Sequence, residues 1–230
     1  MARLLSRVLV ASTVAASLAT SALAAGWEGP AAQIKRSVRR VTSQYLDEYG
    51  NVGTGGCTAF SINDLRDYFL TAAHCFGTNM TVGDKPARLV LLDIPSDLMV
   101  LVVPESGEVP EVRPAKLRDC PDGSRGYTCQ GQDLAAMGYG FGGMVPLLKT
   151  GTVAYSNVAI PGWGFGANEE MLLTGFSYIP GMSGGPVFNR DGRIVGVVQW
   201  GDNDNYVGGG RALGEVLRVT GEYWGVNEKR

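Results

Sequence analysis

Short apolar segments separated by turn signals run through the chain from Val38 almost to its C-terminus. Runs rich in β-branched and aromatic residues, with Gly, Pro, Asn and Asp between them, predict short strands joined by tight turns. We expect strands at residues 40–45, 53–62, 88–94, 98–103, 134–139, 151–160, 171–176, 186–189 and 193–200. Regularly spaced strands of this kind predict an all-β protein, built as a barrel or a sandwich.

Turn signals divide this pattern further. Asp47-Glu48-Tyr49-Gly50-Asn51 is suited to a hairpin loop, Pro95-Ser96 to a turn, and Asp191-Gly192 is a strong hairpin signal. The stretch 105–126 is rich in Pro, Gly and charge, which predicts a division into two lobes, at about 38–118 and about 127–212. A short helix is expected at about 213–224.

The N-terminus has a different composition. Arg3 and Arg7 precede an apolar stretch from about 8 to 23 that ends in Ala22-Leu23-Ala24, the arrangement of a secretory signal peptide cut after Ala24. A membrane anchor fits less well, because several Ser and Thr residues interrupt a stretch that is already short. We expect a signal peptide at 1–24, a flexible lead or short propeptide at 25–37, and a mature protein that is periplasmic or secreted.

Composition narrows the possible functions. The chain has 230 residues, 45% of them hydrophobic, which excludes a disordered protein, and a formal net charge of -2, which offers no basic surface for nucleic acid. No segment after the first 24 residues approaches the roughly 20 apolar residues of a spanning helix. We therefore expect no nucleic-acid or membrane partner after signal cleavage, and a monomer.

Four cysteines fit an exported protein, in which disulfides persist. They allow three pairings, of which Cys57 with Cys75 and Cys120 with Cys129 is favoured, because each couple is close in sequence. A zinc site is the alternative use of cysteine, but the chain has no C-x-x-C pair and a single histidine, His74. No metal is expected.

Two short strings carry chemistry: Thr71-Ala72-Ala73-His74-Cys75 and Gly181-Met182-Ser183-Gly184-Gly185-Pro186. A serine hydroxyl is a weak nucleophile and needs an adjacent base, and imidazole is the side-chain base whose ordinary pKa suits neutral pH. The glycines leave the Ser183 hydroxyl uncrowded. They also let the backbone amides of Gly181 and Ser183 point at one spot, as an oxyanion hole requires.

Both strings resemble those of the chymotrypsin-like (trypsin-type) serine peptidases, and the resemblance extends from about Val38 to Trp224. It implies two six-stranded antiparallel β-barrels with the site in the cleft between them. It also implies hydrolysis of protein or peptide substrates through a covalent acyl-enzyme, without a cofactor. The first lobe would supply His74 and an aspartate, and the second lobe would supply Ser183 and the oxyanion hole.

The aspartate expected from the resemblance is Asp97, which opens the apolar run 97–101. Asp93 is the competing candidate. The implied role is to orient His74 through the ring nitrogen that faces away from Ser183. The separations, 23 residues from His74 to Asp97 (97−74) and 86 from Asp97 to Ser183 (183−97), are similar to those of the compact bacterial branch, with its glutamyl endopeptidases and HtrA-type proteases.

The chain departs from animal members of the family at Met182. They carry an aspartate there, which pairs with a new N-terminus after zymogen cleavage, so we expect no such activation switch. Residue Ser177, six positions before Ser183, stands where trypsin-type enzymes have their pocket aspartate, which predicts a neutral or apolar residue before the cleaved bond. Gln199-Trp200-Gly201 resembles the family's substrate-pairing segment, and Gly210 is expected on the pocket wall.

Two alternatives belong to other functional classes. A catalytically silent relative would use the same fold for binding, although such relatives normally lose a member of the triad and none is missing here. An esterase of the α/β-hydrolase type shares the G-x-S-x-G string but has its histidine after the serine in the chain. Because no histidine follows Ser183, an esterase of this type is excluded.

Overall fold

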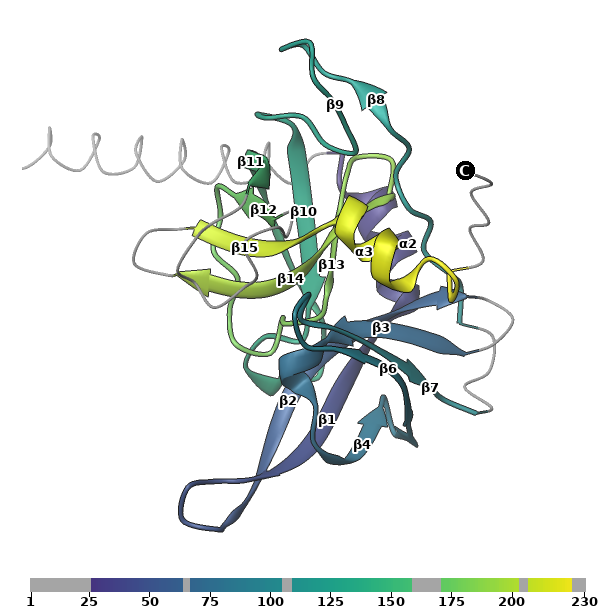
Figure 1. Cartoon of the computed structure of the whole chain (residues 1–230), viewed down its shortest axis with the longest axis vertical. Coiled ribbons are helices and arrows are strands. Elements are labelled where there is room, and N and C mark those ends of the chain that lie inside the picture. Colours follow the sequence, from purple (N-terminus) through teal and green to yellow (C-terminus); the bar gives the residue numbers. More distant parts are fainter. Residues whose placement is uncertain (1–25, 64–66, 105–108, 159–170, 203–206, 225–230) are drawn as a thin grey trace, which may run out of the picture.

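The computed structural model describes residues 26–63, 67–104, 109–158, 171–202 and 207–224, so the predicted signal peptide lies outside the described residues. The strands form two large antiparallel sheets, one in each lobe, with a helix at each end of the described chain (Figure 1). The elements are α2 (Glu28–Ser37), β1 (Val38–Leu46), β2 (Val52–Asn63), β3 (Tyr68–Ala72), η1 (Ala73–Cys75), β4 (Thr78–Val82), β5 (Lys85–Pro86), β6 (Arg88–Asp93), β7 (Leu98–Val102), β8 (Arg118–Asp119), β9 (Arg125–Gly126), β10 (Asp133–Gly138), η2 (Gly140–Gly142), β11 (Leu147–Val158), β12 (Met171–Thr174), β13 (Pro186–Phe188), β14 (Ile194–Asp202), β15 (Val207–Ala212) and α3 (Leu213–Thr220).

The second lobe is a closed barrel of six strands, in the order β10-β11-β12-β15-β14-β13. This confirms the six-stranded antiparallel barrel predicted for that lobe. The expected hairpin turn at Asp191-Gly192 joins β13 to β14, and Gly192 has a positive φ of 68°, which that turn requires. Strand β15 was not predicted, because Val207-Gly208-Gly209-Gly210 offers almost no side chains from which a pattern could be read.

The first lobe is a curled sheet of seven strands, ordered β5-β4-β1-β2-β3-β7-β6. It confirms the all-β fold but differs in detail from the predicted six-stranded barrel, because its two edge strands are not hydrogen-bonded to each other. Only Ala87 separates β5 from β6 in the chain, and its N–H donates to the carbonyl oxygen of Met80 (2.9 Å). The sheet therefore closes through the covalent chain at this point rather than through a ladder.

Strands β3 and β7 are buried on both faces, which explains why they are continuous apolar runs. Leu70 and Val100 belong to a core shared by the two lobes. Their chain neighbours Phe69 and Leu101 point to the opposite face and fill the interior of the first lobe. A strand covered on both sides has no polar alternation in its sequence.

Both predicted disulfides are present. Cys57–Cys75 joins β2 to η1 across a separation of 18 residues, a constraint of about 3 kcal/mol on the loop-entropy model. Cys120–Cys129 closes the small β8–β9 hairpin.

The segment predicted as a flexible lead is instead a helix, α2. Glu28 lies in its first turn and Lys35 in its last, which complements the helix dipole. Trp27, just before the helix, is 2% exposed; it meets Phe188 edge-on at 5.7 Å and carries the Arg190 guanidinium 4.3 Å above its ring. Within the helix itself the buried residues are Ile34 and Ser37, too few to form a recognisable apolar pattern.

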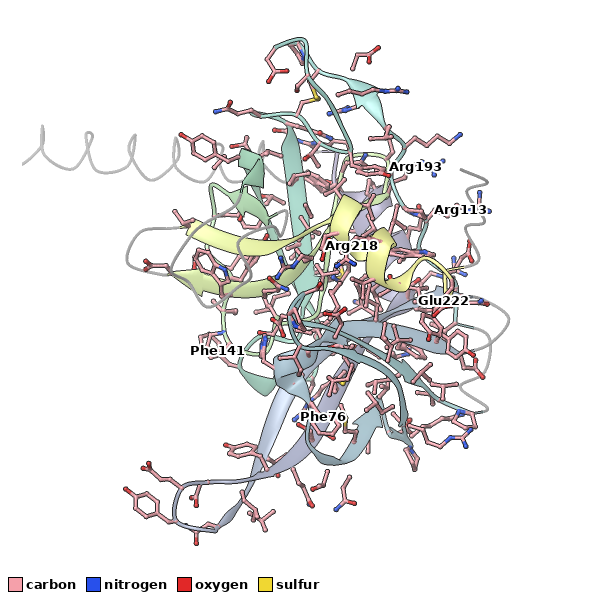
Figure 2. The ribbon with its side chains drawn as sticks, viewed as in Figure 1. Phe76, Arg113, Phe141, Arg193, Arg218 and Glu222 are labelled. Carbon is pink, nitrogen blue, oxygen red and sulfur yellow. A yellow bond between two sulfur atoms is a disulfide. The ribbon has the colours of Figure 1, made fainter. Side chains whose placement is uncertain are left out.

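Beside the apolar core that the lobes share, a buried polar network around Ser96, in the turn between β6 and β7, also links them. The Ser96 carbonyl oxygen accepts hydrogen bonds from Gln199 Nε2 (2.8 Å) and Arg211 Nε (2.9 Å), and its hydroxyl donates to Glu215 Oε1 (2.6 Å). Gln199 and Arg211 lie on β14 and β15, and Glu215 lies on α3. Figure 2 shows Arg218, the ion-pair partner of Glu215, near the centre of the molecule where the lobes meet.

Helix α3 ends at Thr220, four residues before the end of the predicted helix, and turns follow to Trp224. The Trp224 indole is 3% exposed and donates to the carbonyl oxygen of Val112 (3.0 Å). No helix in the described ranges is long and apolar enough to cross a bilayer.

Trp27→Ala tests whether α2 is an integral part of the fold. Because Trp27 fills the core, we expect its removal to lower the free energy of unfolding by about 3–5 kcal/mol, measured by urea denaturation. Tyr49→Ala removes an aromatic ring that is 81% exposed and should change the same quantity by less than about 0.5 kcal/mol. Equal effects of the two variants would show that α2 is dispensable.

Glu215→Gln tests the network at the lobe junction. Hydrogen bonds from Arg218 lower the pKa of Glu215 below its ordinary 4.5, against the opposing effect of burial, and the Ser96 hydroxyl and the Arg211 charge add to the lowering. The folded state therefore holds the carboxylate, and its contribution is complete above pH 4.5 and is lost as the pH falls through the lower folded-state pKa. We expect the variant to be about 1–2 kcal/mol less stable at pH 7, because Arg218 is more than half exposed.

Urea unfolding at pH 7, 5 and 3 measures this difference, which should shrink toward pH 3. The exposed Glu48 provides the control, Glu48→Gln, which should change the free energy of unfolding by less than about 0.5 kcal/mol at pH 7. A Glu215→Gln deficit that is the same at all three pH values would contradict the role given to the carboxylate.

Candidate active site

The candidate base, His74, lies in η1 directly after β3. Strand β3 ends in the lobe core, and the short helix then turns the chain so that the His74 side chain is 46% exposed. The next residue, Cys75, is bonded to Cys57, and the sulfurs lie within 4.8 Å of a ring nitrogen of His74. The disulfide thus fixes the backbone on one flank of the imidazole.

The structure brings Asp97 to His74 twice. One carboxylate oxygen, Oδ2, lies 2.8 Å from His74 Nδ1, and the other, Oδ1, accepts the backbone N–H of His74 at 2.8 Å. Asp97 closes the turn after β6 with a positive φ of 52°, a conformation that aspartate and asparagine tolerate. Its competitor, Asp93, uses Oδ1 to accept the N–H of Ser96 within the same turn.

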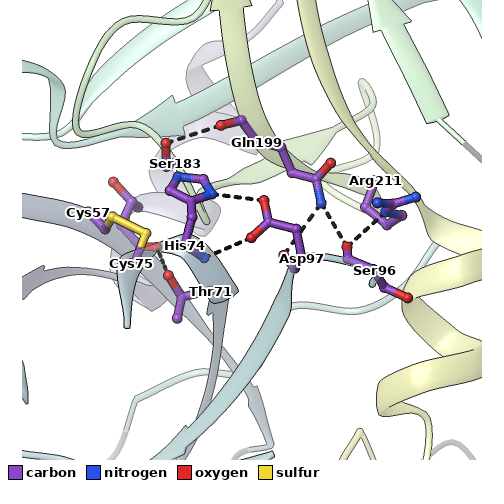
Figure 3. A network of polar contacts seen from close by, with 10 residues as sticks. Cys57, Thr71, His74, Cys75, Ser96, Asp97, Ser183, Gln199 and Arg211 are labelled. Atoms are coloured by element: carbon purple, nitrogen blue, oxygen red, sulfur yellow. Dashed lines mark hydrogen bonds and ion pairs between the residues drawn. A yellow bond between two sulfur atoms is a disulfide. The ribbon is translucent and has the colours of Figure 1, made fainter. Parts of the chain in front are cut away.

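Ser183 lies in a tight turn before β13, on the side of His74 opposite Asp97 (Figure 3). Its hydroxyl donates to the carbonyl oxygen of Gln199 (3.2 Å). The turn requires glycine at residue 184, which has a φ of 80° and whose Cβ would overlap Thr71 Oγ1 and the carbonyl oxygen of Thr58. Close contact with the first lobe therefore sets the position of Ser183.

The amides of Gly181 and Ser183, predicted from the sequence as an oxyanion hole, lie in the same turn as the candidate nucleophile. The carbonyl oxygen of Pro180 accepts the N–H of Phe141 (2.6 Å). Because the Pro180–Gly181 peptide bond is trans, the Gly181 N–H points away from Phe141. Within the described residues, neither the Gly181 N–H nor the Ser183 N–H has an acceptor. Two backbone donors are thus free beside the candidate nucleophile.

Thr58, which the sequence analysis did not identify, anchors this turn from the other lobe. Its N–H donates to the carbonyl oxygen of Ser183 (2.8 Å), and its hydroxyl donates to that of Gly181 (2.7 Å) and accepts the Tyr139 N–H (2.9 Å). It follows Cys57 in the chain, and only the fold brings it to residues more than 80 positions away.

The residues predicted for substrate specificity all belong to the second lobe. Ser177 is buried and donates its hydroxyl to the carbonyl oxygen of Tyr178 (3.0 Å). A Cβ on Gly201 would overlap the Tyr178 backbone, so the segment that includes Trp200 lies directly against that residue. Gly210 faces the backbone of β14, whereas Gly208, which the sequence analysis missed, faces the Tyr178 ring. The specificity roles stay predictions.

Among the described residues, one group combines three potential metal ligands: Cys57, His74 and Cys75. Its two sulfurs are bonded to each other, whereas a metal is bound by thiolates. This donor set therefore does not suit a metal ion.

Comparisons with known proteins identify the family and the fold. The family model of the trypsin-like peptidase domain matches residues 57–197, more than half of the chain. A search of curated proteins found no match. The M. tuberculosis Rv3671c protease in its active form is 25% identical, with a TM-score of 0.69 over 86% of this chain and 85% of that one.

Its inactive form is also 25% identical, with a TM-score of 0.64 over 86% and 94% of the two chains. An inactive-form serine-to-alanine mutant of the same protease aligns with 23% identity over 90% and 95%, with a TM-score of 0.65. The family match and these structures lead to one conclusion: the chain belongs to the trypsin-like peptidases and is a serine peptidase, a hydrolase of peptide bonds.

Proposed function

We propose that this peptidase is an exported endopeptidase whose catalytic triad is His74, Asp97 and Ser183. The observation that carries the proposal is the double contact of the Asp97 carboxylate with His74, to Nδ1 and to the backbone N–H. This contact leaves Nε2 as the ring nitrogen directed away from the acid, on the side where Ser183 lies (Figure 3).

The reaction follows from these positions. Ser183 Oγ attacks the substrate carbonyl carbon while His74 Nε2 takes the hydroxyl proton, and the amides of Gly181 and Ser183 hold the resulting oxyanion. The C–N bond then breaks, and His74 returns the proton to the leaving amine. Water attacks the acyl-enzyme with His74 again as base, which releases the acid and restores Ser183.

One adjustment precedes attack. The Ser183 hydroxyl donates to the Gln199 carbonyl and must turn to His74 when substrate binds. Catalytic hydrogen bonds commonly align only in the substrate complex. The Ser183 backbone does not have to move, because Thr58 holds its carbonyl oxygen.

A neutral or apolar residue before the cleaved bond is part of the proposal. Ser177 stands where trypsin-type enzymes have an aspartate, and its hydroxyl is already bonded to the neighbouring carbonyl. The segment Gln199-Trp200-Gly201 would pair with the substrate backbone. A peptide-library profile dominated by Lys, Arg or Glu at this position would contradict this part.

Export rests on the predicted signal peptide and on the two disulfides, which persist in oxidising compartments. Activation by a released N-terminus is not expected, because Met182 has no carboxylate and is fully buried in the apolar core. The active form would therefore begin near Ala25 and keep α2.

Labelling with a fluorophosphonate probe tests the triad. Wild type should react, whereas Ser183→Ala and His74→Ala should not. Asp97→Asn keeps the shape of the side chain and tolerates the positive φ. It no longer favours the His74 tautomer that carries its proton on Nδ1, so we expect a loss of about 10⁴-fold in kcat.

Asp93→Asn is the matched control, because Asp93 lies in the same turn without contacting His74. It should lower kcat by less than about threefold. No labelling of folded, disulfide-intact wild type would favour the silent, binding-only alternative, and equal losses in the two asparagine variants would remove Asp97 from the triad.

Mass spectrometry of the exported protein tests the processing. We expect an N-terminus at Ala25 and full probe labelling of that form. A further truncation to Val38 should abolish labelling, because it removes Trp27 and the rest of α2 from the core. Labelling that appears only after such a truncation would show that 25–37 is a propeptide.

A further inference from the structure

A pocket of about 300 Å³ lies beside the proposed oxyanion hole, lined by Gly181, by Phe141 and Gly142 of η2, by the residues 54–56 of β2 and by Arg40 of β1. This volume is at the lower end of the range for ligand pockets and suits one amino-acid side chain. Figure 2 shows Phe141 at the edge of the molecule beside the lobe junction.

Arg40 carries the one charge among the residues that line this pocket. Val38, two residues earlier on the same face of β1, is buried in the core shared by the lobes, so the Arg40 stem continues from that core toward the surface. A Cβ on Gly142 would lie 3.7 Å from Arg40 Nη2, which places the guanidinium at the η2 side of the pocket.

Among the residues that the structure describes, none supplies a counter-charge to this guanidinium. Its Nε is buried without a hydrogen-bond acceptor, and within the described part of the chain Arg40 forms no ion pair. The neighbouring Arg39 differs, because its Nη1 donates to the carbonyl oxygens of Arg36 and Val38 (both 2.8 Å). A partly buried cation without a partner is costly, and a carboxylate entering the pocket would supply a counter-charge to the guanidinium through its terminal nitrogens, such as the Nη2 near Gly142.

The pocket lies on the side of the leaving group. His74 must face the leaving amine to return its proton, and Cys75, the residue after it, is bonded to Cys57, which directly follows Gly56 of the pocket wall. The segment proposed to pair with the other half of the substrate starts at Gln199, whose carbonyl oxygen binds the Ser183 hydroxyl. None of its residues lines the pocket.

We propose that Arg40 selects substrates with a carboxylate within the first two residues after the cleaved bond, an inference that rests on the proposed function. Each residue of an extended peptide spans about 3.3 Å, so a pocket that begins at Gly181 is reached by the first or second residue. The carboxylate belongs either to an Asp or Glu side chain or to the substrate's own C-terminus.

The test compares kcat/KM for peptides of one sequence with Glu or Gln at each of these two positions, and for peptides ending there as the free acid or the amide. Wild type should favour the charged peptide by about tenfold, the effect of one charge-assisted hydrogen bond. Arg40→Met, which keeps the apolar stem, should bring this ratio close to one, and Arg40→Lys should leave an intermediate ratio.

Arg39→Met removes the same charge one residue away and should leave the ratio as in wild type. The arm in which the preference appears, side chain or free terminus, identifies the source of the carboxylate. Equal rates for charged and neutral peptides in wild type, or a preference that survives in Arg40→Met, would overturn the inference.

Binding of the same peptides to Ser183→Ala, measured by fluorescence anisotropy with and without Arg40→Met, separates this inference from the proposed function. Tighter binding of the acidic peptide that disappears with Arg40→Met supports the pocket even where wild type fails to react with the fluorophosphonate. If wild type reacts with the fluorophosphonate but the acidic and neutral peptides bind with equal affinity, the triad is supported and the role of Arg40 is ruled out.

Discussion

The Ser96 carbonyl oxygen is the point on which the site depends. It belongs to the first lobe, yet both of its hydrogen-bond donors, Gln199 and Arg211, come from the second. Because Asp97 is the next residue, the orientation of its carboxylate toward His74 is set from across the lobe junction. Thr58 provides the converse contact, since a first-lobe side chain holds the turn that carries Ser183.

These contacts place charge inside the protein. Arg211 is fully buried and Glu215 is 6% exposed, and both meet at Ser96. Replacing such a group with an apolar residue of similar volume is often neutral for stability, whereas removing one partner leaves the other uncompensated. The network is therefore better understood as a device for positioning one turn than as a source of stability. The apolar core that the lobes share binds them to each other, but it does not by itself fix the orientation of Asp97.

Local strings were sufficient to predict both disulfides and most strands, and to single out His74 and Ser183 as candidates, because each depends on residues close in sequence. Helix α2 was missed, since it packs through a few side chains such as Trp27 and shows no continuous apolar pattern. The sequence also did not predict that the first lobe has seven strands. The division of one edge of the sheet into β5 and β6 at Ala87 depends on how the whole sheet curls, which no local pattern records. The roles of Thr58 and Arg40 come from contacts across the fold that no local pattern records.

The junction between the lobes also bears on the order in which the parts of the site form during synthesis. Ribosomes make the chain from residue 1 onward, so His74 and Asp97 exist well before the strands and the helix that hold Ser96. Glu215 of α3 is among the last of these partners to emerge. A nascent chain that has not yet reached α3 thus carries His74 and Asp97 without the contacts that would place them.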